Sequence, residues 1–184
     1  MMKIKKIATG LAVGISLSLL SSSAVFAAPN KGFNKANPKR NEFKKNGCMV
    51  TVKAGLSSNP MAYDKKTIEI DVEKCKKKFL IVLENTNMEA FSKAAMGHNL
   101  VISSGKDKSA VLKDAMTAGK SKWYLGDKGY LYATAMLAPK EFHDLEIDVT
   151  KIQKYGDLKF FCTFLGHSAM VGDIVLKKNT KKKS

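Results

Sequence analysis

Several residue types that define common protein classes are scarce in this sequence. Its 184 residues include three cysteines, four prolines and one tryptophan. Three cysteines are too few for a disulfide-rich mini-scaffold or a four-cysteine zinc site. Acidic residues are also few, 16 against 32 lysines and arginines, so the formal net charge is +16. Hydrophobic residues make up 45% of the chain, which indicates a globular protein with room for one domain.

The longest apolar run lies near the N-terminus, from Ile7 to Leu20, and follows the lysine-containing start Met1–Lys6. Small residues and then Val25-Phe26-Ala27 come after it. We therefore predict that residues 1–27 are a signal peptide cleaved after Ala27, and that the mature protein is exported to a compartment where disulfides persist. An uncleaved anchor fits less well, because glycine and serine dilute the run. No other stretch approaches the ~20 apolar residues that span a bilayer.

The positive charge is concentrated towards the two ends of the chain. Residues 28–46 contain six basic residues and one acidic residue, and residues 177–184 contain five lysines. Because both segments are poor in apolar residues, we predict a flexible basic N-terminal tail at 28–46, a folded domain at 47–178 and a basic C-terminal tail at 179–184. Nucleic-acid binding is not favoured, since the domain has no basic stripe interleaved with aromatic residues. The tails are either merely solvated or steer the protein towards an acidic partner or anionic lipid.

Apolar and polar residues alternate in residues 67–73 and 144–149, which is typical of strands with one buried face. Other predicted strands, bounded by turn signals, cover residues 49–53, 79–83, 99–103, 130–135, 158–162 and 173–176. Ser109–Ala118 instead has the spacing of a short helix or flap. Many short strands with one helical insertion predict an all-β fold, a β-sandwich.

The three cysteines divide into two plus one. Cys48 lies at the start of the first predicted strand, and Cys75 follows the second. A bridge between them would stabilise the fold by roughly 3–4 kcal/mol through loop closure. The sequence alone allows three pairings. We predict that Cys162 stays free because of its neighbours.

The loop that follows a predicted strand at Cys162 brings together three metal-binding side chains. Cys162 offers a thiol, His167 an imidazole and Met170 a thioether, all within nine positions. A thiolate with imidazoles and a weak, distant methionine sulfur is the donor set that suits copper. Zinc would need a fourth strong ligand and accepts methionine poorly.

A second imidazole must come from elsewhere in the chain. His98 lies at the head of another predicted strand and supplies it, whereas His143 stands among charged residues and is predicted to be an ordinary exposed histidine. Each of these residues alone is more often a packing residue than a ligand. Together they favour a copper site.

Two stretches, MGHN at Met96–Asn99 and FFCTFLGHSAM at Phe160–Met170, closely resemble the azurins, which are cupredoxins with a type 1 blue copper centre. The resemblance extends from Gly47 to about Lys178. It implies a cupredoxin-like, eight-stranded Greek-key β-sandwich with a helical flap. It also implies that Cys48 and Cys75 form the disulfide.

The resemblance also implies one copper ion held by His98, Cys162 and His167, with Met170 as the axial ligand and the Gly97 carbonyl as a distant fifth donor. Asn99 and the backbone N–H of Phe164 match positions around the thiolate, where hydrogen bonds help to set the redox potential.

The sequence departs from the azurin pattern at three points. Leu165 replaces the usual proline of the loop, and Leu100 replaces a usual buried tryptophan. Only two residues separate His167 from Met170, one fewer than is typical of azurins. A tighter loop is expected to change the distance between the Met170 sulfur and copper.

The leading functional prediction is a periplasmic electron carrier that cycles between Cu(I) and Cu(II) and is not an enzyme. Its partners would be a c-type cytochrome or another periplasmic redox protein, docking at an apolar patch of Met61, Met96 and Leu165 near His167. The alternative is a periplasmic copper-binding protein for storage or delivery. A thiol enzyme with Cys162 as nucleophile ranks lower, because no orienting acid is evident beside His167.

Overall fold

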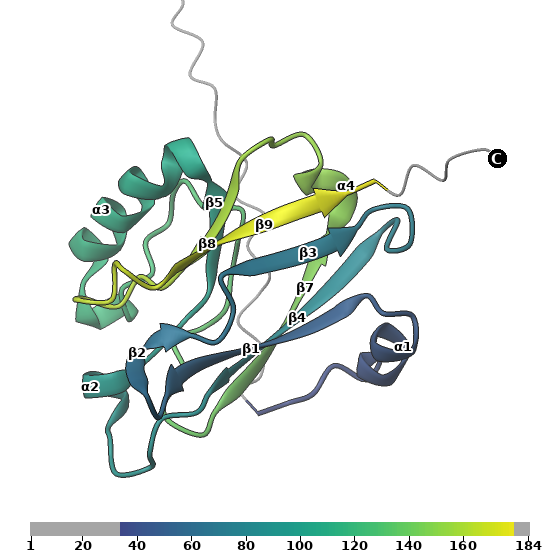
Figure 1. Cartoon of the computed structure of the whole chain (residues 1–184). Helices are drawn as coiled ribbons and strands as arrows, with labels where there is room; N and C mark the ends of the chain where they lie inside the picture. The colour runs from purple at the N-terminus through teal and green to yellow at the C-terminus, as the bar shows by residue number, and fades with distance from the viewer. Residues whose placement is uncertain (1–33, 179–184) are drawn as a thin grey trace, which may run out of the picture.

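The computed structural model describes residues 34–178 of the chain (Figure 1). The predicted signal peptide at 1–27, the first part of the predicted N-terminal tail and the C-terminal tail at 179–184 lie outside the described residues. Within residues 34–178, no helix combines the length and the apolar character that a membrane crossing requires.

Two sheets account for the strands of the described chain, and Figure 1 shows them packed as a sandwich. The first sheet contains, in spatial order, β2 (Asn59–Tyr63), β1 (Met49–Leu56), β4 (Lys78–Asn85) and β7 (Phe142–Asp148). The second contains, in spatial order, β3 (Thr67–Asp71), β9 (Val171–Lys177), β8 (Leu158–Phe161), β5 (Val101–Ser104) and β6 (Tyr132–Ala133). The pairs β1–β4 and β3–β9 are parallel, and the other pairs are antiparallel.

The core lies between the two sheets and follows from the apolar pattern of the strands. In β3, Ile68 and Ile70 are buried while the residues between them are exposed or half-buried. The run Phe79–Leu83 in β4 is buried throughout, because this strand lies inside its sheet and helices also contact it. Each fully buried aliphatic side chain of this kind contributes about 1.5–3 kcal/mol of transfer free energy.

The helices are short and lie outside the strands. They are α1 (Arg40–Lys45), α2 (Lys93–Met96), α3 (Lys108–Ala118) and α4 (Val149–Ile152), with 3₁₀ turns η1 (Gly105–Asp107) and η2 (Lys120–Lys122). The predicted helical insertion corresponds to α3, which buries Val111 and Ala115. Val111 packs with Val101 and Phe161 of the second sheet, so the insertion covers part of that sheet.

The two-sheet arrangement confirms the predicted β-sandwich with a helical insertion, and two local features differ from the prediction. No strand was predicted at residues 59–63, yet Asn59–Tyr63 form β2, which pairs with β1 through Leu56 and Asn59. The predicted strand at 144–149 ends at Asp148, whose side chain accepts a hydrogen bond from the Thr150 N–H and caps α4. Such a cap favours helix over strand at that point.

The prediction of a flexible tail at 28–46 is wrong for residues 34–46. Arg40–Lys45 form α1, and Phe43 is buried in the main core. The Arg40 guanidinium pairs with the Asp144 carboxylate and lies 4.8 Å from the centre of the Phe142 ring. One buried aromatic side chain and one anchored arginine therefore attach an otherwise polar segment to the domain.

The residues before α1 run along β7, which is an edge strand of its sheet. The Asn34 N–H donates to the Phe142 carbonyl over 3.1 Å, and the Asn37 N–H donates to an Asp144 carboxylate oxygen over 2.7 Å. The segment thus covers part of an edge whose backbone groups would otherwise be open to pairing with another chain.

His143 was expected to be exposed, and this is also wrong. It is only 6% exposed, because it shares the inward face of β7 with Leu145 and Ile147. Its Nδ1 accepts a hydrogen bond from the Ala135 N–H. Burial lowers the pKa of His143, while the neighbouring Asp144 acts in the opposite direction. The polar neighbours in the sequence belong to the other face of the strand.

Replacing Phe43 with alanine is expected to lower the free energy of unfolding by about 3 kcal/mol, because the change removes a buried aromatic ring. Asn41 lies on the exposed side of the same helix and provides the control. Asn41→Ala should change the free energy by less than about 0.5 kcal/mol. Urea unfolding of both variants measures the difference, and equal small effects would show that α1 is not docked.

Candidate metal centre

Strand pairing brings His98 and Cys162 together although 63 residues separate them. His98 lies just before β5, and Cys162 follows directly after β8. These strands are antiparallel neighbours, with Val101 opposite Phe161. The chain segments that precede β5 and follow β8 therefore lie at the same end of the second sheet.

The loop between β8 and β9 brings in a third side chain, that of His167. The Cys162 Sγ lies 3.8 Å from the His167 Nδ1, and the rings of His98 and His167 stack with their centres 4.8 Å apart. One candidate ligand atom from each of the three residues lies within 4.8 Å of those of the other two. All three side chains are buried, with His98 and Cys162 inaccessible to solvent and His167 3% exposed.

The orientation of the His98 ring leaves one nitrogen for a metal. Its Nδ1 is buried and has no hydrogen-bond partner. The ring also donates a hydrogen bond to the backbone carbonyl of Pro60, since proline has no N–H to donate. Because Nδ1 has no partner, the donated proton lies on Nε2. The Asn87 side-chain amide nitrogen lies 2.9 Å from the same Nε2. A buried, unpartnered imidazole nitrogen beside a thiol and a second imidazole fits a copper ion.

Backbone hydrogen bonds close the short loop that follows Cys162. The Cys162 N–H donates to the Met170 carbonyl over 3.1 Å, and the Met170 N–H donates to the His167 carbonyl over 2.8 Å. The His167 N–H donates to Phe164 over 3.0 Å, and Gly166 has a φ of +88°, which favours glycine. Met170 is buried as a result, at 1% exposure, despite the shortened spacing.

Asn99 connects the two halves of the site. Its side-chain oxygen accepts from the Thr163 N–H over 2.9 Å, and its amide donates to the Thr163 hydroxyl over 2.8 Å. The Tyr63 hydroxyl donates to the Asn99 carbonyl. These buried bonds tie the residue after His98 to the residue after Cys162, so the two ligands cannot separate without leaving polar groups unpaired.

The surroundings of Cys162 act on its ionisation in opposite directions. Burial raises the pKa of the Cys162 thiol to about 11, while hydrogen bonds from the backbone N–H groups of Asn99 and Phe164 lower it. The same two bonds would stabilise a thiolate bound to a metal.

The two imidazoles are kept neutral. Burial, with a smaller effect of the nearby His167, lowers the pKa of His98 to about 4. Burial also lowers the pKa of His167. Both rings therefore keep a lone pair for a metal at neutral pH.

The structure gathers most of the residues singled out in the sequence. His98, Cys162 and His167 meet at one point, Met170 is buried in the same loop, and Gly97 is buried next to His98. Cys48 and Cys75 form a disulfide, as the resemblance implied.

Four contributors to the site had not been identified from the sequence, and one of them is Tyr63, which donates to the Asn99 carbonyl. Thr163 stood inside the loop motif without an assigned role, whereas Pro60 and Asn87 lie outside both motifs, and no local pattern marks them. The bonds that these residues make to Asn99 and His98 depend on the approach of distant segments.

A two-sheet sandwich with a buried site of one cysteine and two histidines defines a copper-binding protein of the cupredoxin type. Comparison with known proteins agrees. The profile of the family described as copper binding proteins, plastocyanin/azurin family, matches residues 50–177. The chain belongs to this plastocyanin/azurin family of copper-binding proteins.

Individual relatives are similar over most of their length. Azurin of Alcaligenes faecalis is 38% identical over 132 residues, covering 70% of this chain and 98% of the relative. Azurin of Pseudomonas putida is 38% identical over 136 residues, covering 71% and 98%. A solved structure of the azurin Az-iso2 from Methylomonas sp. strain J aligns with a TM-score of 0.62 and 25% identity, over 71% of this chain and 98% of that one.

Copper binding is expected to release the Cys162 proton, because a thiol with a pKa raised to about 11 is protonated in the metal-free protein at neutral pH. The imidazoles, with their lowered pKa values, release none. The affinity for copper should therefore fall about tenfold for each unit by which the pH is lowered from about 9 to about 7. Competition with a chelator of known affinity measures this slope. Cys162→Ser should bind more weakly and nearly independently of pH, and an unchanged slope would contradict the assignment.

Proposed function

We propose that the protein carries single electrons between redox partners in the periplasm, with one copper ion held by His98, Cys162 and His167. The Met170 sulfur would be a weak axial ligand, and the Gly97 carbonyl a distant donor. The observation that carries the proposal is the buried, unpartnered Nδ1 of His98 beside the thiol and the second imidazole.

The residues around the proposed ligands suit electron transfer because they restrict movement. Bound copper would supply one-electron chemistry, passing between Cu(II) and Cu(I). The Asn99–Thr163 hydrogen bonds and the backbone bonds of the loop hold the donor atoms in one arrangement. The N–H groups of Asn99 and Phe164 would stabilise the negative sulfur in either state. Little rearrangement is then needed when an electron enters or leaves.

Burial of the ligands favours a carrier over a protein that delivers copper. An acceptor protein would have to reach His98 and Cys162, and neither is accessible to solvent. The same burial disfavours a thiol enzyme, since a nucleophilic cysteine needs a lowered pKa and access for substrate. The Cys162 thiol has a raised pKa instead.

The apolar side chains near the site provide a docking surface for a redox partner. Met61 is 48% exposed and Leu165 is 56% exposed, while Met96 is half-buried. Met61 follows Pro60, Met96 lies two residues before His98, and Leu165 lies two residues before His167. A small apolar patch beside a buried imidazole suits a brief encounter with a c-type cytochrome or another periplasmic redox protein.

The periplasmic location rests on the N-terminal sequence and on the disulfide. Residues 1–27 have the features of a cleavable signal peptide. The Cys48–Cys75 disulfide is typical of a protein that works in an oxidising compartment.

Adding one equivalent of Cu(II) to the purified protein is expected to give an intense blue colour and a reversible one-electron reduction. The colour depends on the Cys162 thiolate, so Cys162→Ser should remain pale. Visible and electron-paramagnetic-resonance spectra, followed by voltammetry, measure these properties. A colourless complex would overturn the proposal, and rapid loss of copper to an acceptor protein would favour delivery over electron transfer.

Met96→Glu is expected to slow electron exchange with a c-type cytochrome about tenfold, because it places a charge in the apolar docking surface. The visible spectrum should stay the same, since Met96 is not a proposed ligand. Met116→Glu makes the same change at an exposed methionine on α3, outside the patch, and should leave the rate nearly unaltered. Stopped-flow kinetics compare the two variants, and equal rates would remove the patch from the proposal.

A further inference from the structure

A lysine-rich cleft lies around the disulfide. Its volume is about 690 Å³, and Phe43 and the Cys48–Cys75 bridge lie among its lining residues. Six lysines also line it, and we call them the lysine rim: Lys39, Lys45, Lys74, Lys76, Lys77 and Lys78. The rim combines one side chain preceding α1, one from α1, three from the segment between β3 and β4, and that of Lys78, the first residue of β4.

Most of the charge on the rim is not neutralised within the protein. Lys78 pairs with Glu146. The other five lysines of the rim have no ion pair within residues 34–178, and Glu42 is the one acidic residue that lines the cleft.

The backbone that carries the rim is fixed. One Asp71 carboxylate oxygen accepts from the N–H groups of Glu73 and Lys74, each over 3.0 Å. The Asp71 carbonyl accepts from the Cys75 N–H over 2.8 Å, and the disulfide ties the same turn to Cys48, which lies between α1 and β1. The lysines are therefore presented by a rigid platform, although their side chains extend into solvent.

The rim lies at the opposite end of the molecule from the metal centre. β4 begins at Lys78 in the rim and ends at Asn85, whose side chain donates to the Met96 carbonyl near His98. Eight residues of strand span about 23 Å. Figure 1 shows α1 and the C-terminal end of β9 on one side of the molecule and α2 on the other.

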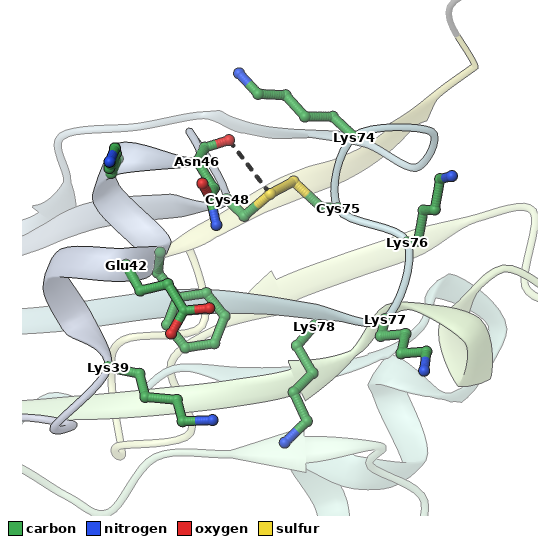
Figure 2. Close-up of a pocket in the computed structure, with 11 residues that line it drawn as sticks. Lys39, Glu42, Asn46, Cys48, Lys74, Cys75, Lys76, Lys77 and Lys78 are labelled. Carbon is green, nitrogen blue, oxygen red and sulfur yellow. Dashed lines mark hydrogen bonds between the residues drawn. A yellow bond between two sulfur atoms is a disulfide. The ribbon is translucent and has the colours of Figure 1, made fainter.

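We propose that the lysine rim docks the protein on the surface of an anionic phospholipid membrane. Figure 2 shows Lys74, Lys76 and Lys77 pointing away from the cleft in different directions, whereas Lys39 and Lys78 extend along one side of it. This arrangement suits an extended negative surface better than a single bound phosphate. Clusters of four to eight lysines are typical of proteins that bind acidic lipids. Each lysine of such a cluster raises the affinity for the membrane by about tenfold or less.

A protein partner fits the rim less well. Stable protein interfaces are enriched in aromatic residues and arginine and depleted of lysine. The nearby aromatic side chain, Phe43, is buried, and Arg40 is engaged with Asp144. The rim thus offers charge without the contacts that a specific protein interface uses.

Docking at this end would leave the metal centre facing away from the membrane. The apolar patch of Met61, Met96 and Leu165 would remain open to soluble redox partners while the protein is held at the lipid surface. This orientation rests on the proposed function, whereas the lipid binding does not depend on copper.

Binding to vesicles of one third phosphatidylglycerol and two thirds phosphatidylcholine tests the proposal. The copper-loaded chain from Ala28 onward, which includes the whole described fold, is sedimented with the vesicles at about 0.05 M and about 0.3 M salt. We expect binding at low salt, a loss of at least about tenfold at high salt, and none to pure phosphatidylcholine. Absence of binding at low salt would overturn the proposal.

Two triple variants with the same change of net charge locate the surface. Lys74→Gln, Lys76→Gln and Lys77→Gln together should weaken binding on the order of a hundredfold. The control combines Lys106→Gln, Lys113→Gln and Lys120→Gln, three exposed lysines in and around α3, and should weaken it less than about threefold. Equal losses would show that total charge alone matters and would overturn the proposal. Circular dichroism and urea unfolding verify that each variant is folded.

Two further measurements separate the remaining outcomes. When the protein is bound to vesicles, hydrogen exchange of the backbone amides should slow in residues 40–45 and 74–78 and stay unchanged in residues 163–170. Slower exchange in residues 163–170 would overturn the proposed orientation. Tight binding of soluble polyphosphate without vesicle binding would assign the rim to a free phosphate ligand and overturn the membrane assignment. A colourless copper complex that still binds vesicles would count against the proposed function alone.

Discussion

The antiparallel pairing of β5 with β8 is the constraint on which the metal centre depends. This pairing places Val101 opposite Phe161 and so brings the segment before one strand to the segment after the other. The reciprocal bonds between Asn99 and Thr163 extend the pairing beyond the last ladder residues. Because these groups are buried, their separation would cost several kcal/mol on the scale of unsatisfied buried hydrogen bonds. The ligand positions are therefore properties of the sheet.

The polar atoms of the site lack a partner that a bound metal ion would supply. The His98 ring has partners on one nitrogen and none on the other, and the Cys162 sulfur receives two N–H groups although burial opposes its ionisation. Without a cation, a buried unpartnered nitrogen is a cost to stability. The family membership of the chain agrees with this arrangement, since the family binds copper.

Much of the fold and of the site was predictable from sequence, because the relevant signals are local. Alternating residues marked β3 and β7, and the helical spacing marked α3. The Cys162 loop carries three donors within nine positions, so its chemistry can be recognised without a structure.

The errors arose where a tertiary contact overrides local composition. Phe43 is a single apolar residue among lysines, and only the core that it enters makes α1 part of the domain. His143 has charged neighbours in the sequence, yet the alternation of β7 turns it inward. Asn87 and Pro60 meet His98 through the approach of β2 to the end of β4, which no nearby residue encodes.

The position of β9 in its sheet determines when the sheet can be completed. β9 lies between β3 and β8, and its parallel pairing with β3 joins residues that are 106 positions apart. During synthesis, β3 and β8 cannot pair with β9 until this last described strand has been made. Until then, both strands have unpaired backbone N–H and C=O groups along one edge. Contacts so distant along the chain also form slowly. A chain built in this order keeps its second sheet incomplete until β9 has left the ribosome, so the sandwich closes late in synthesis.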